Sequence, residues 1–141
     1  MTKEKTETLD QIEIVRWFEL NYPDKSDLLF GNILAGTYIP GKNNFKNYHR
    51  LFQAKKAGSR KGYPDLSLHV ARGGYHALFI EYKTLEAKSP YLKNGNYSSA
   101  YPEQVEYGKK LILEGYYFTF GVGVKSTIDI IKNYMEGKLI R

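Results

Sequence analysis

The sequence predicts a single α/β domain in which helices flank a mixed β-sheet. Two observations indicate this class. Helical and strand-like hydrophobic patterns alternate in the order α-β-α-β-β-α-β-α, and two adjacent strand patterns are joined by the glycine turn Arg72-Gly73-Gly74. The 141 residues are enough for one domain with a real core, so we expect residues 1–141 to form a single unit.

The first helix is predicted over residues 8–20, and Asn21-Tyr22-Pro23 ends it. On a helical wheel one side carries two polar residues followed by apolar ones: Glu7, Gln11, Ile14, Val15 and Phe18. Polar residues at the head of a buried stripe often point into a site. The alternative is that Glu7 lies there because a helix N-terminus favours an acidic side chain.

The next segments predict a strand, a turn and a second helix. Residues 28–39 are apolar but broken by glycines, and residues 40–44 have turn composition. A short helix is predicted over residues 45–57, with Tyr48, Leu51 and Phe52 inward and Gly58 ending it. The loop over residues 59–62 then leads to Pro64 at the start of a strand.

The glycine turn joins two alternating strands, which we expect over residues 65–70 and 78–83. In the first strand Leu66, Leu68 and Val70 alternate with Asp65, Ser67 and His69. In the second strand Leu78, Ile80 and Tyr82 alternate with Phe79, Glu81 and Lys83.

The remaining chain predicts a long loop and three further elements. Residues 84–99 are polar, and a loop of this length is usually functional or mobile. A helix follows over residues 102–114, then a buried strand over 116–124 and a closing helix over 125–135. The inner face of the helix over 102–114 is predicted to hold Gln104, Gly108, Leu111 and Ile112.

The hairpin predicts a pair of facing carboxylates. If it is symmetric about Gly73, Asp65 lies opposite Glu81 on one face, and Lys83 follows on the same face. Directly opposed side chains are roughly 4.5–5.5 Å apart at Cβ, and like charges there are destabilising. Such a pair needs a cation between its members or a raised pKa on one of them. A hard divalent ion, Mg²⁺ above all, fits oxygen ligands, and the arrangement suits phosphodiester cleavage.

Two alternatives stay open on spacing alone. A one-residue slip in the pairing would send one carboxylate to the opposite face. The hairpin is also compatible with one solvated face, on which Glu81 and Lys83 are ordinary surface residues.

The charge of the chain indicates a polyanionic partner. The net charge is +6, and residues 28–64 contain no Asp or Glu. The basic residues of this stretch are Lys42, Lys46, Arg50, Lys55, Lys56, Arg60 and Lys61. A basic segment that leads into a carboxylate site favours nucleic acid, and tyrosines suit stacking. The alternative is that the basic residues only increase solubility.

The composition excludes several classes of protein. With no cysteine, the chain has no disulfide, thiol nucleophile or thiolate zinc site. It also lacks an apolar run of transmembrane length, and its polar first residues do not form a signal peptide. We therefore expect a cytoplasmic location, no membrane and no small-molecule cofactor.

Several motifs together resemble the PD-(D/E)xK nuclease superfamily, and within it the VRR-NUC group. The first is Gly58-Ser59-Arg60-Lys61-Gly62-Tyr63-Pro64-Asp65, and the second is Ile80-Glu81-Tyr82-Lys83. Pro102-Glu103-Gln104, Gly115-Tyr116 and Glu7-x-x-x-Gln11 complete the set in the order that the group shows. The pieces span residues 7–116. Pro-Asp with Glu-x-Lys alone is a weak signal, but the whole series is specific.

The resemblance implies a restriction-endonuclease-like fold and a set of site residues. Asp65 and Glu81 would be metal ligands, together with the backbone carbonyl of Tyr82. Lys83 would position or activate the attacking water. Glu7 would complete the acidic set, and Gln104 would line the site. In the group a Ser commonly precedes the Gln helix, whereas here Ser98 and Ser99 lie slightly early.

VRR-NUC proteins this short resemble stand-alone bacterial and phage versions, which implies a homodimer acting on branched DNA such as Holliday junctions. We therefore expect a Mg²⁺- or Mn²⁺-dependent endonuclease in a bacterium or a phage-infected cell. Three alternatives remain: a non-catalytic module that binds branched nucleic acid, an RNA-directed nuclease and a restriction-type enzyme that reads sequence.

Overall fold

The computed structural model describes the backbone of residues 3–32 and 45–141, and the side chains of residues 6–32, 49–50 and 52–141. Its elements follow the predicted order, with a 3₁₀ helix in addition after the first helix. They are α1 (Lys3–Asn21), η1 (Pro23–Leu28), β1 (Leu29–Gly31), α2 (Phe45–Lys56), β2 (Leu66–Leu68), β3 (Leu78–Lys83), α3 (Pro102–Leu113), β4 (Tyr117–Val122) and α4 (Val124–Met135).

The strands form one mixed sheet in the order β1-β2-β3-β4. β2 is antiparallel to both β1 and β3, whereas β4 runs parallel to β3. Leu66 pairs with Ile80 and Leu68 with Leu78. These pairs are the predicted register of the hairpin, and the predicted α/β class with a mixed sheet is confirmed.

The turn of the hairpin differs from the predicted one. Gly73 and Gly74 both have positive φ, 61° and 91°, and Arg72 and Tyr75 exchange two backbone hydrogen bonds around them. The turn therefore has two residues and is not centred on Gly73. Between this turn and the strands, residues 69–71 on one arm oppose residues 76–77 on the other. The first arm therefore has one residue more than the second, and this extra residue acts as a β-bulge that shifts the register by one.

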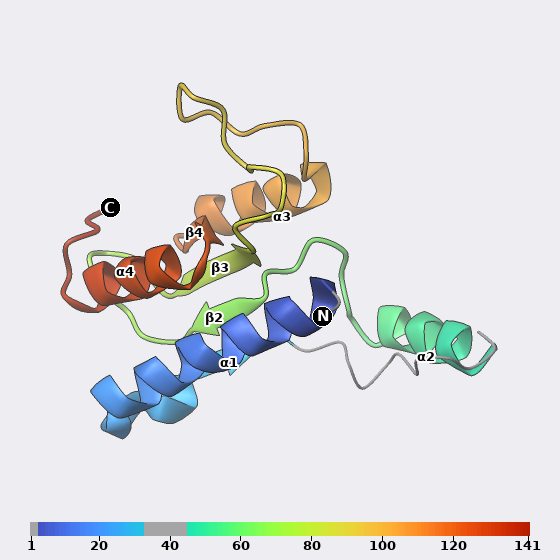
Figure 1. Cartoon of the computed structure of the whole chain (residues 1–141), viewed down its shortest axis with the longest axis horizontal. Helices are drawn as coiled ribbons and strands as arrows, with labels where there is room; N and C mark the ends of the chain where they lie inside the picture. Colours follow the sequence, from blue (N-terminus) through green and yellow to red (C-terminus); the bar gives the residue numbers. More distant parts are fainter. Residues whose placement is uncertain (1–2, 33–44) are drawn as a thin grey trace.

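Both faces of the sheet are covered at β3, so the core has two layers. On one face α1 and α4 pack on the sheet, as Figure 1 shows, and the buried side chains include Ile14, Phe18, Ile80, Ile131 and Tyr134. Ile14 and Phe18 are one helical turn apart, which is the inward stripe predicted for the first helix. On the other face α3 packs on β4, and the segment that precedes α3 helps to cover the aromatic cluster of Phe79, Phe118 and Phe120.

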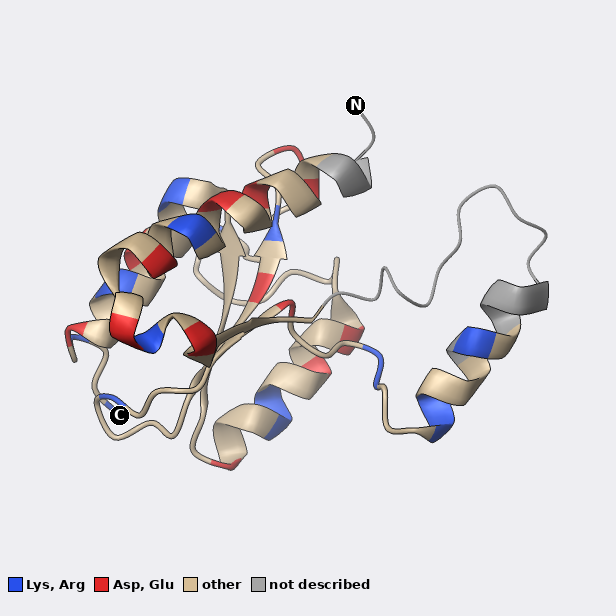
Figure 2. Ribbon diagram, turned by 90° about the horizontal axis from the view of Figure 1, so that it is seen from below, with Lys and Arg blue, Asp and Glu red and all other residues tan. Residues whose placement is uncertain are grey.

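Two expectations about solvent exposure are wrong, and so is the alternative of a solvated hairpin face. The hairpin has no solvated face along β3, because residues 78–82 are all buried. Phe52 of α2 is 50% exposed, since α2 stands apart from the sheet (Figures 1 and 2). Ile112 of α3 is 43% exposed, whereas Gly108 of the same helix is buried as predicted.

Other predictions fall partly outside the described residues. These are the strand beyond residue 32, the turn over residues 40–44 and the inward positions of Tyr48 and Leu51. In the part of the chain that the structure describes, no helix is long and apolar enough to cross a membrane.

Candidate active site

Asp65 and Glu81 come together where the hairpin strands meet. Asp65 directly precedes β2, and the register of the Leu66–Ile80 pair continues to place it opposite Glu81 of β3. The carboxylate Oδ2 of Asp65 accepts a hydrogen bond of 2.9 Å from the backbone N–H of Tyr82. A further hydrogen bond joins the carboxyl groups of Asp65 and Glu81. The two acids therefore share one face of the sheet.

Glu81 is buried and Asp65 is half-buried, so ionisation of this pair of acids is costly. Burial first, and then the nearby Asp65 charge, raise the pKa of Glu81 to about 8, against the opposing effect of the Lys83 ammonium. Burial also raises the pKa of Asp65, although the Tyr82 N–H and Lys83 act in the opposite direction. Two crowded carboxyls that resist losing both protons mark this place as a candidate functional site.

Lys83 lies on the same face as Glu81, two residues further along β3. Its Nζ is 3.3 Å from Oε2 of Glu81, and their side chains are only 12% and 8% exposed. Nζ also lies 3.8 Å from the centre of the Tyr101 ring, a cation–π contact. The Tyr101 hydroxyl donates to the Lys88 carbonyl at 2.8 Å. The ammonium group is thus held between a carboxylate and an aromatic face.

Glu7 lies near the carboxyl pair without joining it. Its charge raises the pKa of Asp65, so α1 brings this side chain within electrostatic reach. Within the described part of the chain, however, no group of three or more His, Asp or Glu side chains is arranged to hold a metal ion. Asp65 and Glu81 are therefore the carboxyl groups that the fold places side by side.

Gln104 lies in the first turn of α3, beside the loop that leads to Asp65. Gly62 in that loop has φ of +80°, and a Cβ atom there would lie 2.4 Å from the Glu103 carbonyl oxygen and 3.2 Å from the Gln104 backbone nitrogen. Only glycine permits both this conformation and this close approach. The Lys-Gly-x-Pro-Asp motif and the Gln helix are thus in contact through Gly62.

Three residues around the site were not identified from the sequence. The backbone N–H of Asn32 donates to the Asp65 carbonyl at 2.7 Å, which places Asn32 beside Asp65 at the end of β1. The Tyr82 hydroxyl donates to Oδ2 of Asp10 in α1 at 2.7 Å. Tyr101 contacts Lys83 as described. No signal in the sequence identifies the Asn32 or Asp10 contacts, but Tyr101 directly precedes the Pro102-Glu103-Gln104 motif.

The predicted nucleic-acid-binding residues lie mostly on α2 and the loop after it, where Figure 2 shows Lys and Arg standing away from the sheet. The exposed ones are Arg50, Lys55, Lys56, Arg60 and Lys61. The Arg60 guanidinium donates to the carbonyls of Lys55 and Ser59. Lys42 and the side chain of Lys46 lie outside the described residues.

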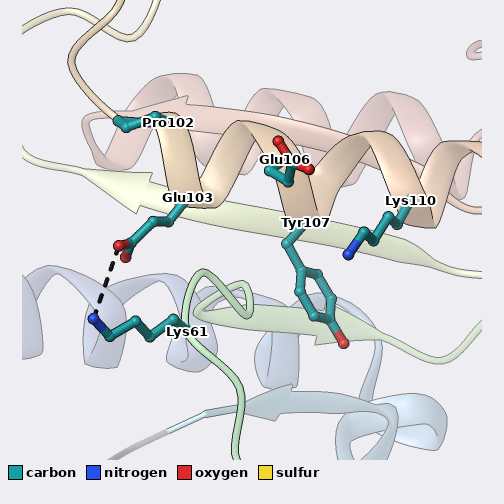
Figure 3. A pocket seen from close by; sticks show the side chains of 6 residues that line it. All are labelled: Lys61, Pro102, Glu103, Glu106, Tyr107 and Lys110. Carbon is teal, nitrogen blue, oxygen red and sulfur yellow. Dashed lines mark ion pairs between the residues drawn. The ribbon is translucent and has the colours of Figure 1, made fainter.

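A surface hollow of about 350 Å³ lies on the outer side of α3. Figure 3 shows Lys61 and Glu103 pointing toward each other across it, with a separation of 3.9 Å, while Glu106, Tyr107 and Lys110 line the rest. Its acidic and basic side chains balance, and neither Asp65 nor Glu81 lines it. The hollow therefore is not a candidate for anion binding.

Comparison with solved structures finds a chain described as a VRR_NUC domain protein. The match has a TM-score of 0.65 and 25% sequence identity, and it covers 94% of this chain and 89% of the other. No family model matches the sequence, and a search of curated proteins finds no match. Over nearly its whole length the chain therefore has the architecture of a VRR_NUC domain protein, which confirms the family resemblance that the motifs indicate.

Proposed function

We propose that this protein is a divalent-metal-dependent DNA endonuclease that hydrolyses phosphodiester bonds at branched DNA such as Holliday junctions. One observation carries the proposal. The carboxyl groups of half-buried Asp65 and buried Glu81 are adjacent, and the Lys83 ammonium lies 3.3 Å from Glu81, in a chain with a nuclease-family fold. Two acids and a lysine on one face are the groups that metal-assisted phosphodiester hydrolysis needs.

The chemistry of the two acids fits a hard divalent cation. Mg²⁺ and Mn²⁺ prefer oxygen donors, and a cation between the carboxylates offsets the repulsion that raises the pKa of Glu81. Asp65, Glu81 and the backbone carbonyl of Tyr82 would hold the ion, with Glu7 completing the acidic set from α1. When bound, such an ion lowers the pKa of a coordinated water and offsets the charge on the phosphate.

The remaining residues bind and orient the substrate. Lys83 presents N–H donors beside the acids, so its role is to orient the attacking water and to stabilise negative charge on the phosphate. Gln104 would line the site from α3. The basic residues between Lys42 and Lys61 would hold the DNA backbone through their charge, which positions a strand without reading its sequence.

A homodimer suits this substrate. Resolution of a four-way junction requires two symmetric incisions, and one small domain carries one site. A C₂ pair of chains supplies two sites related by the symmetry of the junction. The mass of the protein in solution, measured by light scattering with and without junction DNA, tests this part of the proposal.

The decisive experiment is a cleavage assay on four-way, flap, single-stranded and linear duplex DNA in Mg²⁺, Mn²⁺ or EDTA. We expect cleavage of the branched substrates in either metal and none in EDTA. Lys83→Ala and Asp65→Asn should abolish cleavage while binding stays within a few-fold of wild type. Lys93→Ala is the matched control, because Lys93 is an exposed lysine in the loop that follows β3.

Each rival function gives a different result in this assay. Branched DNA that is bound but never cut in any metal indicates a binding module, and preferential cutting of RNA indicates an RNA-directed nuclease. Cutting of linear duplex at fixed positions indicates an enzyme that reads sequence. Full activity in Lys83→Ala or Asp65→Asn would refute the roles assigned to these residues.

A further inference from the structure

Phe30 lies on the face of the sheet that carries the two acids. It is the central residue of edge strand β1 and pairs with Ser67, which in turn pairs with Phe79 of β3. Side chains that are directly opposed in a sheet share a face, and so do residues two apart along one strand. Asp65 and Glu81 are two residues from Ser67 and Phe79, so Phe30 shares their face.

Phe30 differs from the other aromatic residues of this face in its exposure. Phe79 and Phe118 continue the same row across the sheet and are each 6% exposed, because α3 and its aromatic cluster cover them. Phe30 is 55% exposed. Next to it on the same face, His69 is exposed and Leu28 is 37% exposed. The layer formed by α3 therefore ends before β1 and leaves one large aromatic ring open beside the acids.

The position of Phe30 relative to the acids follows from sheet geometry. Asn32 lies beside Asp65, and Phe30 is two residues earlier on the same strand. With about 3.3 Å per residue along a strand and about 4.8 Å between strands, the Cα atoms of Phe30 and Asp65 are ~8 Å apart. This distance corresponds to about two base steps of a DNA strand at 3.4 Å each.

The charge around this face favours nucleic acid as the occupant. The loop that leads to Asp65 presents the exposed side chains of Arg60 and Lys61, of which Lys61 also lies 3.9 Å from Glu103. Basic side chains that follow a strand backbone, combined with an exposed aromatic ring, are the combination that binds unpaired nucleotides. An apolar protein partner would have to bury these charges at its rim, whereas DNA neutralises them.

We propose that Phe30 is a stacking platform for an unpaired base within about two nucleotides of the scissile phosphate. The substrate class is DNA whose strand is unpaired beside the cut, as at a flap or a branch point. A base in a continuous duplex is already stacked on its neighbours, and taking it out costs free energy. This inference rests on the proposed function, because it places the scissile phosphate at Asp65 and Glu81.

The test measures binding in EDTA, so it requires no cleavage. Fluorescence anisotropy compares a flap DNA with a linear duplex of the same sequence, and 2-aminopurine replaces the first unpaired base of the flap. Phe30→Ala should weaken flap binding roughly tenfold, remove the change in 2-aminopurine emission and leave duplex affinity unchanged. Phe30→Trp should restore flap binding, whereas Phe30→Leu, which keeps an apolar side chain without a ring, should not.

Leu20→Ala is the matched control, because Leu20 is an 82% exposed apolar residue on the surface of α1. It should bind both substrates as the wild type does, and thermal unfolding should show that every variant is folded. Equal weakening on flap and duplex, or no weakening in Phe30→Ala, would overturn the inference. So would a lower mass for Phe30→Ala in light scattering, since Phe30 would then lie between two copies of the chain.

Failure of this inference is distinguishable from failure of the proposed function. If the wild type cuts flaps in Mg²⁺ but Phe30→Ala binds them normally, the nuclease function is supported and the stacking role of Phe30 is refuted. If the wild type cuts no substrate in any metal while Phe30→Ala still weakens flap binding, the stacking role is supported and the nuclease function is refuted.

Discussion

Nζ of Lys83 lies 3.8 Å from the centre of the Tyr101 ring and 3.3 Å from Oε2 of Glu81. The Tyr101 hydroxyl is itself bonded to the Lys88 carbonyl, so the ring is fixed by the loop that it ends. The ammonium group therefore contacts two different partners, the carboxylate of Glu81 and the aromatic ring of Tyr101. This relationship makes Tyr101 a positioning residue for the lysine.

Replacement of Tyr101 should impair catalysis in proportion to the loss of the ring. Tyr101→Leu should lower kcat on a branched substrate by roughly 5- to 30-fold, since a desolvated cation–π contact is worth about 1–2 kcal/mol. Tyr101→Phe keeps the ring and should retain most activity. Tyr97→Leu is the control, because Tyr97 also contacts Phe120 but has no contact with Lys83 among the described interactions. Equal losses in Tyr101→Phe and Tyr101→Leu would contradict the role of the ring.

The stability of the metal-free protein should fall as pH rises from about 4.5 to about 8. Glu81 has a pKa of about 8 in the folded protein, against an ordinary value of 4.5 for a glutamate side chain in water. Over this window the unfolded chain has lost the proton that the folded chain retains, so higher pH favours unfolding, by at most about 3–5 kcal/mol. Urea unfolding in EDTA at several pH values should show this slope in the wild type and a flatter one in Glu81→Gln.

Addition of Mg²⁺ is the complementary measurement for Glu81. A cation that binds only the folded protein stabilises it by mass action, and it binds best once the carboxyl is ionised. We expect Mg²⁺ to raise wild-type stability at pH 8 more than at pH 5, and to affect Glu81→Gln far less. If the free energy of unfolding in EDTA changed equally with pH in the wild type and in Glu81→Gln, Glu81 would not titrate as its surroundings indicate.

Gly62→Ala should both destabilise the protein and reduce cleavage. The new Cβ would lie 2.4 Å from the Glu103 carbonyl oxygen, and φ at this position is +80°. Gly95→Ala separates the two causes, because Gly95 has a similar φ of +86° with no atom within 4 Å of its Cβ position. We expect Gly95→Ala to lower the free energy of unfolding by about 1 kcal/mol, from backbone strain alone, and Gly62→Ala to lower it by more. Urea unfolding measures both, and equal losses would show that the loop moves freely off α3.

Tyr82→Phe should weaken metal binding through the backbone that Tyr82 holds. Its hydroxyl anchors β3 to Asp10 of α1, and its N–H bonds the Asp65 carboxylate. Tyr134→Phe is the matched control, since it removes an equally short bond, to the Val70 carbonyl at 2.7 Å, in the core. Both variants should lose roughly 1 kcal/mol of stability or more. Calorimetry should show weaker Mg²⁺ binding for Tyr82→Phe alone, and equal affinity in both variants would exclude a positioning role.

The sequence was sufficient to predict the order of the α-helices and strands and the facing acids, because both depend on local patterns. Alternating residues define β3, and the spacing of Ile14 and Phe18 defines the inner side of α1. Asp65 and Glu81 were paired correctly, although by way of a turn symmetric about Gly73 that the protein does not have. The true turn and the extra residue at 69–71 compensate for each other.

The other features depend on contacts between distant segments, which a single sequence does not encode locally. A helical wheel gave Phe52 an inner side, but α2 has no sheet beside it to bury that side. Alternation along β3 was compatible with a solvated face, and only the packing of α3 and the aromatic cluster shows that both faces are covered. The cation–π partner of Lys83 lies 18 residues away, counted from 83 to 101, across a loop without periodicity.

Because of the bulge at residues 69–71, Asp65 and Glu81 share one face of the sheet only while the number of residues in this hairpin arm stays odd. If the arms ran without interruption from the Gly73-Gly74 turn, Asp65 would face Tyr82, and its carboxyl would point toward α1 and α4, away from Glu81. An even number of inserted residues in this arm leaves both acids on one side, whereas a single insertion or deletion separates them. We therefore expect relatives of this protein to vary the length of the arm in steps of two, unless the turn changes with it.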